Sequence, residues 1–131
     1  MPHLRFDLSV PVGDDDRAAF AAWVAETYGD VMDTGTDHVG VVVTETDPHL
    51  GQADDDDPVA FVNADIRVGR TTDQRHNLAR RLTSELGERF GIPEQTVYVV
   101  FTEHEGPDFV LGGDPLDSWD PDEATAPEQS E

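Results

Sequence analysis

The chain has 131 residues, of which 37% are apolar, and its formal net charge at pH 7 is -21. This length allows one domain with a modest core. The charge argues against nucleic acid or an anionic membrane surface as a partner, because both are bound through basic residues.

The excess of Asp and Glu, with arginine in place of lysine, is typical of halophilic cytoplasms, where concentrated salt screens surface repulsion. No apolar stretch approaches the roughly 20 residues that span a bilayer, and no signal peptide is visible, so we expect a cytoplasmic protein. The chain has no cysteine, which excludes disulfides, thiolate nucleophiles and sulfur-ligated metals. Its five histidines have no metal-ligand spacing, so we expect most of them to be solvated and no metal to be bound.

The first half of the chain has the pattern of a strand, a helix and a second strand. Residues 3–10 alternate between apolar and polar side chains, as in a half-buried strand. The acidic run Asp14 to Asp16 suits a helix N-terminus, and Gly29 is a plausible stop. Residues 39–44 read as the second strand.

The second half repeats this order. Residues 59–68 alternate like the first strand, and residues 72–90 carry leucines four apart on one helical face. Thr71 and Gln74 form a candidate capping box, and Gly91 closes the helix. Residues 96–102 read as its second strand.

A shift of 58 residues lays Val41–Glu45 on Val99–Glu103, which indicates two similar units. We therefore predict an α+β fold of two tandem βαβ units that form a four-stranded sheet with two helices on one face. The expected domain covers residues 1–116, with unit one at about 2–50, an acidic insert at 51–57 and unit two at 58–114. The acidic residues 117–131 are expected to form a disordered tail.

Polar side chains line the face of the sheet opposite the helices. They include Arg5, Asn63, Asp65 and Arg67. This face is too polar for a core but too regular to be incidental, so we expect it to pack against partner subunits.

Three motifs in the second unit occur in a set order. They are Ile66-Arg67-Val68-Gly69-Arg70 before a capped helix, a strand that ends in Thr102-Glu103, and Phe109-Val110-Leu111-Gly112-Gly113. In this order they resemble the tautomerase superfamily, most closely its 4-oxalocrotonate tautomerase family. The resemblance covers residues 58–114 well and residues 2–45 more loosely.

This resemblance implies a homotrimer of two-unit chains with an amino-terminal catalytic proline. Pro2 stands in that position once Met1 is removed. Arg70 matches the arginine of the family's "GR" motif, and Phe109 matches the aromatic residue that forms the apolar wall of the pocket.

The chemistry of Pro2 also follows from its amine. An α-amino group titrates near neutrality, and burial or a nearby guanidinium lowers its pKa further. The free amine could then move a proton between carbon and oxygen of a 2-oxo acid. Arg70 would bind the carboxylate through its planar fork, and Arg67 would face the substrate oxygen.

Each arginine could instead pair with a surface carboxylate, and Phe109 could be a core or interface residue. Tyr98 stands where 4-oxalocrotonate tautomerases have a second arginine, so a dicarboxylate substrate is not implied. We name Tyr98 as a candidate substrate-binding residue, with an ordinary strand position as the alternative.

The Arg67-x-x-Arg70 pair is similar to the pattern of the cis-3-chloroacrylic acid dehalogenase family. The acid and the tyrosine of that pattern would fall near Leu111 and Val100, however, which disfavours hydrolytic dehalogenation.

We therefore predict a cofactor-independent keto–enol tautomerase that acts on a small 2-oxo acid, with Pro2, Arg70 and Arg67 as catalytic residues. The first alternative is a decarboxylase of a small 3-oxo acid, for which Asp37, just before the second strand, would be the carboxylate beside Pro2. The second alternative is a trimeric module without enzymatic activity.

Overall fold

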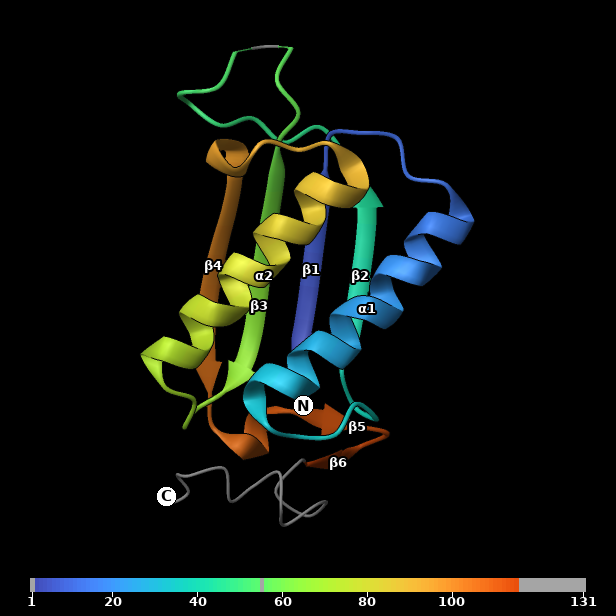
Figure 1. The fold of residues 1–131 in the computed structure, drawn as a ribbon. Coiled ribbons are helices and arrows are strands. Elements are labelled where there is room, and N and C mark those ends of the chain that lie inside the picture. Colours follow the sequence, from blue (N-terminus) through green and yellow to red (C-terminus); the bar gives the residue numbers. More distant parts are fainter. Residues whose placement is uncertain (1, 55, 116–131) are drawn as a thin grey trace.

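The computed structural model describes residues 2–54 and 56–115 (Figure 1). The main elements alternate strand, helix and strand twice. They are β1 (His3–Leu8), α1 (Asp14–Met32), β2 (Gly40–Glu45), β3 (Ala60–Arg67), α2 (Thr72–Phe90) and β4 (Val97–His104). Two single-turn 3-10 helices, η1 (Glu94–Thr96) and η2 (Gly106–Asp108), flank β4, and a small hairpin of β5 (Val110–Leu111) and β6 (Asp114–Pro115) follows.

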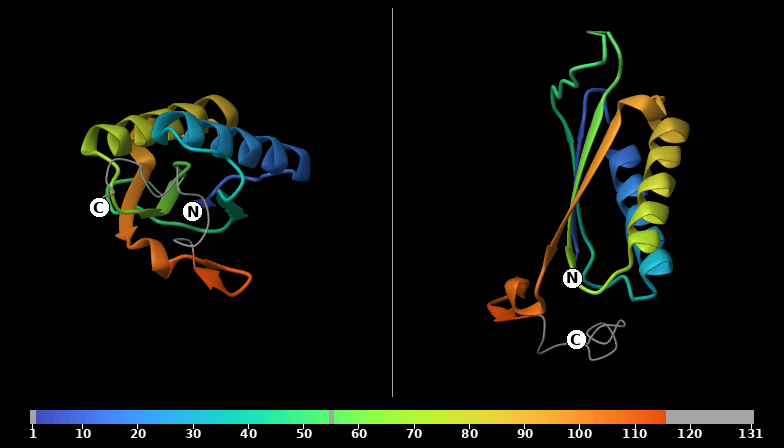
Figure 2. Two further views of the ribbon diagram at one scale, coloured as in Figure 1. Left: turned by 90° about the horizontal axis from the view of Figure 1, so that it is seen from below. Right: turned by 90° about the vertical axis from the view of Figure 1, so that its left-hand side faces the viewer.

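The four long strands form one sheet in the order β2-β1-β3-β4. Each unit contributes a parallel pair, β1 with β2 and β3 with β4, and the two units meet through the antiparallel pair of β1 and β3. Both helices cover the same face of the sheet, as the side view in Figure 2 shows. The α+β fold of two tandem βαβ units is therefore confirmed.

The core lies between the helices and the sheet. Leu4, Phe6 and Leu8 of β1 are fully buried there, and their neighbours along the strand face the other way. The Phe6 ring meets the ring of Phe20 from α1 edge-on, at 4.9 Å between centroids. Burial of this apolar stripe holds the helix layer on the sheet.

Helix α2 has the bounds that its capping residues predict. The Thr71 side chain accepts a hydrogen bond from the Gln74 backbone N–H, and the Gln74 side chain accepts one from the Thr71 backbone N–H. At the other end Gly91 adopts a left-handed conformation with φ 71°. Both ends of the helix are thus fixed by local hydrogen bonds.

The predicted stop of α1 at Gly29 is wrong, because the helix continues to Met32 and ends at Asp33 in a left-handed conformation. Gly29 has a different reason to be small. The chain folds back over it after the helix, and a Cβ at Gly29 would lie 2.8 Å from the Thr34 carbonyl oxygen. The glycine therefore permits the close turn and does not end the helix.

One end of the sheet gathers most of the predicted site residues. We call it the Pro2 end: β1 and β2 begin there, and β3 and β4 end there. The face of the sheet away from the helices, the open face, carries the polar side chains of β1 and β3. The β5–β6 hairpin projects on the open-face side at the Pro2 end (Figure 2).

No helix among residues 2–54 and 56–115 is both long and apolar enough to cross a bilayer.

Candidate active site

Pro2 is buried at the start of the central strand β1. Its carbonyl oxygen accepts a hydrogen bond of 3.0 Å from the Gly40 backbone N–H, which ties the residue to the start of β2. On its other side β3 runs antiparallel, with Asp65 paired to His3, so Pro2 lies level with the last residues of β3. The strand register therefore holds Pro2 beside the segment that carries Arg67 and leads to Arg70.

Arg70 lies in the loop between β3 and α2, and only 5% of its surface is exposed. Its Nη1 donates a hydrogen bond of 3.1 Å to the carbonyl oxygen of Met32, the last residue of α1. A cation at this position also complements the negative end of the helix dipole. Its Nε is buried and has no hydrogen-bond partner among the described residues.

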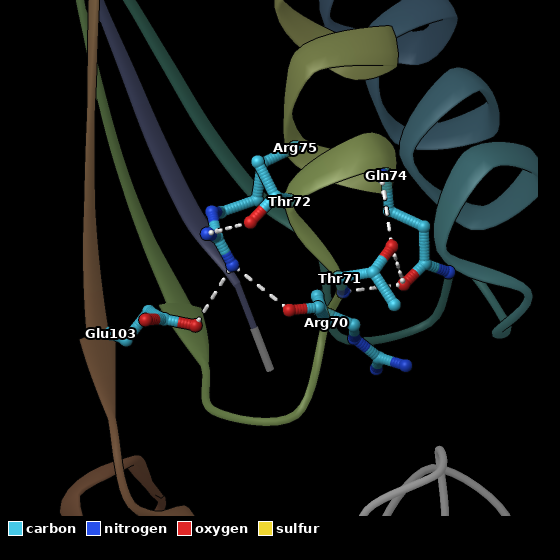
Figure 3. A network of polar contacts seen from close by, with 6 residues as sticks. All are labelled: Arg70, Thr71, Thr72, Gln74, Arg75 and Glu103. Carbon is cyan, nitrogen blue, oxygen red and sulfur yellow. Dashed lines mark hydrogen bonds and ion pairs between the residues drawn. The ribbon is translucent and has the colours of Figure 1, made fainter.

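Figure 3 shows that the Arg70 guanidinium points away from the neighbouring Arg75 and Glu103. Arg75 donates one hydrogen bond of 2.9 Å to the Arg70 carbonyl and forms an ion pair with Glu103 at 3.3 Å. Glu103, a carboxylate close to the loop, is thus already paired with a different arginine. The positive charge of Arg70 is left without a carboxylate in these contacts.

Arg67 ends β3 on the open face, where η2 lies against its guanidinium group. Gly106 of η2 is buried, and a Cβ there would come within 2.5 Å of Arg67 Nη2. The absent side chain lets the guanidinium lie under the turn. Arg67 Nη1 is buried and, within the described ranges, has no hydrogen-bond partner.

A cluster of polar side chains lies on the open face beside Arg67. The Asp65 carboxylate accepts hydrogen bonds from the Thr102 hydroxyl and from His104 Nε2, the latter at 2.9 Å, and His3 Nδ1 lies 4.0 Å from it. The bond from Thr102 and then that from His104 hold the pKa of Asp65 below its ordinary value of 3.8, so the group is a carboxylate near neutral pH.

Phe109 lies next to this cluster at the Pro2 end. Its ring meets the His104 ring edge-on at 5.5 Å between centroids, and the residue is half-buried. Most histidines are expected to be solvated, and the His104 side chain is 37% exposed but also bonds the Asp65 carboxylate. No local sequence pattern indicates this bond, because Asp65, the partner of His104, lies 39 residues away in the chain.

Tyr98 is not brought to Pro2 within one chain. Tyr98 pairs with Phe61 of β3, and Phe61 pairs with Asp7 near the end of β1 that is far from Pro2. Tyr98 therefore lies about five residues, or ~16 Å along the strand direction, from Pro2. Its side chain is 54% exposed on the open face. Asp37, in contrast, lies in an exposed turn just before β2, which places it at the Pro2 end.

A hollow of about 420 Å³ lies at the opposite end of the sheet. It is lined mainly by the loops around the acidic insert, including Asp47, Asp54, Asp56 and Asp57. Negative charge disfavours an anionic substrate there. In the part of the chain that the structure describes, no three His, Asp or Glu side chains are placed to hold a metal ion.

Residues 61–118 match the family model described as "Tautomerase enzyme". No curated protein matches the chain.

Several solved structures have the same fold over most of the chain. Leishmania major MIF2 is 19% identical, with a TM-score of 0.77 over 88% of this chain and 97% of the other. A native fused 4-OT is 23% identical, with a TM-score of 0.73 over 88% and 97%. N1, a member of the cis-3-chloroacrylic acid dehalogenase family, is 24% identical, with a TM-score of 0.71 over 86% and 82%. The chain thus matches the tautomerase family model over residues 61–118, and over most of its length it shares the fold of these MIF, 4-OT and cis-3-chloroacrylic acid dehalogenase family proteins.

Proposed function

We propose that this protein is a cofactor-independent tautomerase that interconverts the keto and enol forms of a small 2-oxo acid. The observation that carries the proposal is the pair of guanidinium groups at the Pro2 end, each with one buried nitrogen that lacks a hydrogen-bond partner among the described residues, Arg70 Nε and Arg67 Nη1. A buried donor without an acceptor is costly, and a carboxylate or an enolate oxygen is the acceptor that best fits a guanidinium.

Pro2 is the base in this proposal. After Met1 is removed, its secondary amine is the α-amino group of the chain, and burial at the sheet end favours the neutral form. The amine takes a proton from the carbon next to the substrate carbonyl, and the electron pair of that C–H bond moves to make the enolate. The prolinium then returns the proton to the enolate oxygen to give the enol, and the reverse sequence gives the ketone.

The two arginines have different roles. Arg70 is fixed by its bond to Met32, so its free Nε is held ready for the substrate carboxylate. Arg67, held under η2, faces the oxygen on which negative charge develops, where a fixed cation stabilises the transition state. Phe109 provides an apolar wall that excludes water from this end.

Assembly is part of the proposal. Tyr98 can contact substrate only from a second copy, since in its own chain it lies near the other end of the sheet. We infer a homotrimer in which the open faces of three copies meet, and a cytoplasmic location for it.

The position of Asp37 favours a second candidate function, decarboxylation of a small 3-oxo acid. In that reaction the carbon–carbon bond to the carboxylate breaks, carbon dioxide leaves, and a cationic prolinium stabilises the enolate that remains. A carboxylate beside Pro2 would keep the amine protonated, and Asp37 precedes β2 at this end. Release of carbon dioxide from malonate semialdehyde distinguishes this function from tautomerisation.

The test combines the mass of the native N-terminus with a kinetic assay. We expect intact-mass measurement to show that Met1 is absent, and the ketonisation of enol-phenylpyruvate in concentrated salt to be catalysed. Pro2→Ala should lower kcat/KM by about 100-fold or more, the usual size of a general acid–base contribution. Pro11→Ala, at an exposed proline outside the site, is the matched control and should match the wild type.

Retention of Met1 in the native protein would make the Pro2 nitrogen an amide and favour the non-enzymatic module. Equal activity of Pro2→Ala and wild type would exclude the proline mechanism even if the protein is active.

A further inference from the structure

The chain between β4 and the hairpin forms a compact turn that lies over Arg67. Backbone hydrogen bonds close it, from Asp108 N–H to Glu105 O at 2.9 Å and from Phe109 N–H to Gly106 O at 3.0 Å. Gly106 is its point of contact with the guanidinium. We call residues 105–109 the cover turn. Its position decides both where Arg67 lies and where the Phe109 ring stands.

Most of the side chains of the cover turn do not anchor it. Glu105, Pro107 and Asp108 are exposed, and Phe109 is half-buried. The backbone holds its start through one hydrogen bond of 2.9 Å, from Val68 N–H to the His104 carbonyl. Besides the contact of Gly106 with Arg67, a link to the sheet runs through the His104 side chain, which contacts the Phe109 ring on one side and Asp65 on the other.

Asp65 lies close enough to Arg67 to be its ion-pair partner, but its hydrogen bonds are made elsewhere. The two residues are two apart on one strand, so both side chains lie on the open face, and a carboxylate is the usual partner of an arginine there. Thr102 and His104 both bond Asp65 Oδ1 and His3 lies 4.0 Å from Oδ2, while Arg67 Nη1 has no partner among the described residues. The cluster thus keeps the carboxylate turned toward β4 and leaves the guanidinium available.

We propose that Asp65 and His104 are positioning residues, a polar latch that fixes the cover turn over Arg67 and holds the Phe109 wall in place. The latch touches neither the substrate nor Pro2. It acts through Arg67 and Phe109, and its role in catalysis rests on the proposed function. Its role in holding the turn does not, because the turn can be observed without substrate.

The first experiment measures amide hydrogen exchange by NMR in the full-length protein with Met1 removed. The amides of Asp108 and Phe109 report on opening of the cover turn. Asp65→Ala and His104→Phe should each speed their exchange about tenfold, the effect of losing one charge-assisted hydrogen bond. The double variant should be no faster than Asp65→Ala alone, because both single variants remove the same bond between His104 and Asp65.

Asp65→Asn keeps an oxygen acceptor without the charge and should give an intermediate rate. The matched control is Asp7→Ala, which removes the open-face carboxylate held by Arg5 and Thr44 at the other end of β1. It should leave both amides within twofold of the wild type. Exchange within twofold of the wild type in Asp65→Ala and His104→Phe would overturn the latch.

The second experiment separates binding from chemistry in the enol-phenylpyruvate assay. A loose cover turn should raise KM about tenfold, because Phe109 walls the bound substrate, and should also lower kcat, because Arg67 stabilises the charge that develops in the transition state. A general loss of folded protein would instead lower kcat with KM unchanged, and that result would contradict a positioning role. If the wild type itself has no activity, the proposed function fails, and the exchange rates still decide whether the latch exists.

Discussion

The Asp65 carboxylate combines three polar neighbours with partial exposure. Its side chain is 41% exposed, so solvent screens its interactions and its contribution to stability is modest. The bond from Thr102 is the largest cause of its lowered pKa, and the bond from His104 is the next. A group of this kind ties folding to pH.

This coupling predicts how the stability difference between the wild type and Asp65→Asn changes with pH. Because the folded pKa lies below the unfolded value of 3.8, the contribution of the charged carboxylate is fully present above that value and is lost as pH falls through the folded pKa. The wild type should therefore be more stable near pH 6, and the difference should shrink as pH falls below 3.8. Urea unfolding at a series of pH values measures it.

Thr102→Val tests whether the hydrogen bond from Thr102 is the cause of the lowered pKa of Asp65. Without the hydroxyl, the substitution of Asp65 by Asn should have a smaller effect at pH 6. A stability difference that does not change between pH 6 and pH 3 would show that the pKa of Asp65 is not lowered.

The contacts of the candidate site were predictable from sequence to different degrees. Pro2, Arg67 and Arg70 lie in motifs whose local spacing places them at strand ends, and the strand register brings these ends together. The bond from His104 to Asp65 and the contact of Gly106 with Arg67 join residues 39 positions apart in the chain. Contacts of this kind depend on tertiary register, which no local pattern in a single sequence specifies.

At the scale of elements, helix ends were predictable where they are capped by side chains or glycine. Thr71, Gln74 and Gly91 carry this information for α2. Helix α1 has no side-chain cap at its start, and its end is stabilised by Arg70 and Gln74 from the other unit. Its end could therefore not be found from its own residues.

The β5–β6 hairpin was not predicted, although its turn has a readable signal. Gly112 and Gly113 both have positive φ, 61° and 88°, as a two-residue turn between antiparallel strands requires. Strands of two residues have too short a pattern to be detected by alternation.

The end of α1 provides a prediction at the element scale. Asp33 holds a left-handed conformation with φ 57° and ψ 53°, and its negative charge lies at the negative end of the helix dipole. Asp33→Asn removes the charge and introduces a residue that adopts this conformation more readily. It should raise the free energy of unfolding by about 0.5 to 1 kcal/mol and Tm by a few degrees.

Asp73→Asn is the matched control of opposite sign, because Asp73 is an exposed carboxylate in the first turn of α2, where negative charge is favourable. It should lower Tm in the same thermal scan. If Asp33→Asn lowered Tm as well, Asp33 would have a stabilising contact that outweighs the dipole and the backbone strain.

At the scale of the whole molecule, the open face and the net charge act in opposite directions. Val42 and Val100 are each 39% exposed on this face, on the edge strands β2 and β4, whose outer sides have no partner strand in the described sheet. Exposed edges with apolar side chains favour association with another copy. Each copy, however, carries a charge of -21, and like charges repel on assembly.

These two features predict an assembly that depends on salt. In about 2 M KCl the Debye length falls below about 3 Å, so repulsion between copies is screened and the homotrimer should predominate in sedimentation velocity. Val100→Glu places a charge on the open face, the proposed interface, and should shift the protein to monomer. Ser84→Glu adds the same charge at an exposed position of α2, in the helix layer, and should leave the trimer intact.

In 0.1 M KCl the monomer fraction of the wild type should rise, because repulsion between the acidic surfaces is no longer screened. A wild type that is monomeric at both salt concentrations, or a Val100→Glu variant that remains trimeric, would show that the open face is not the interface.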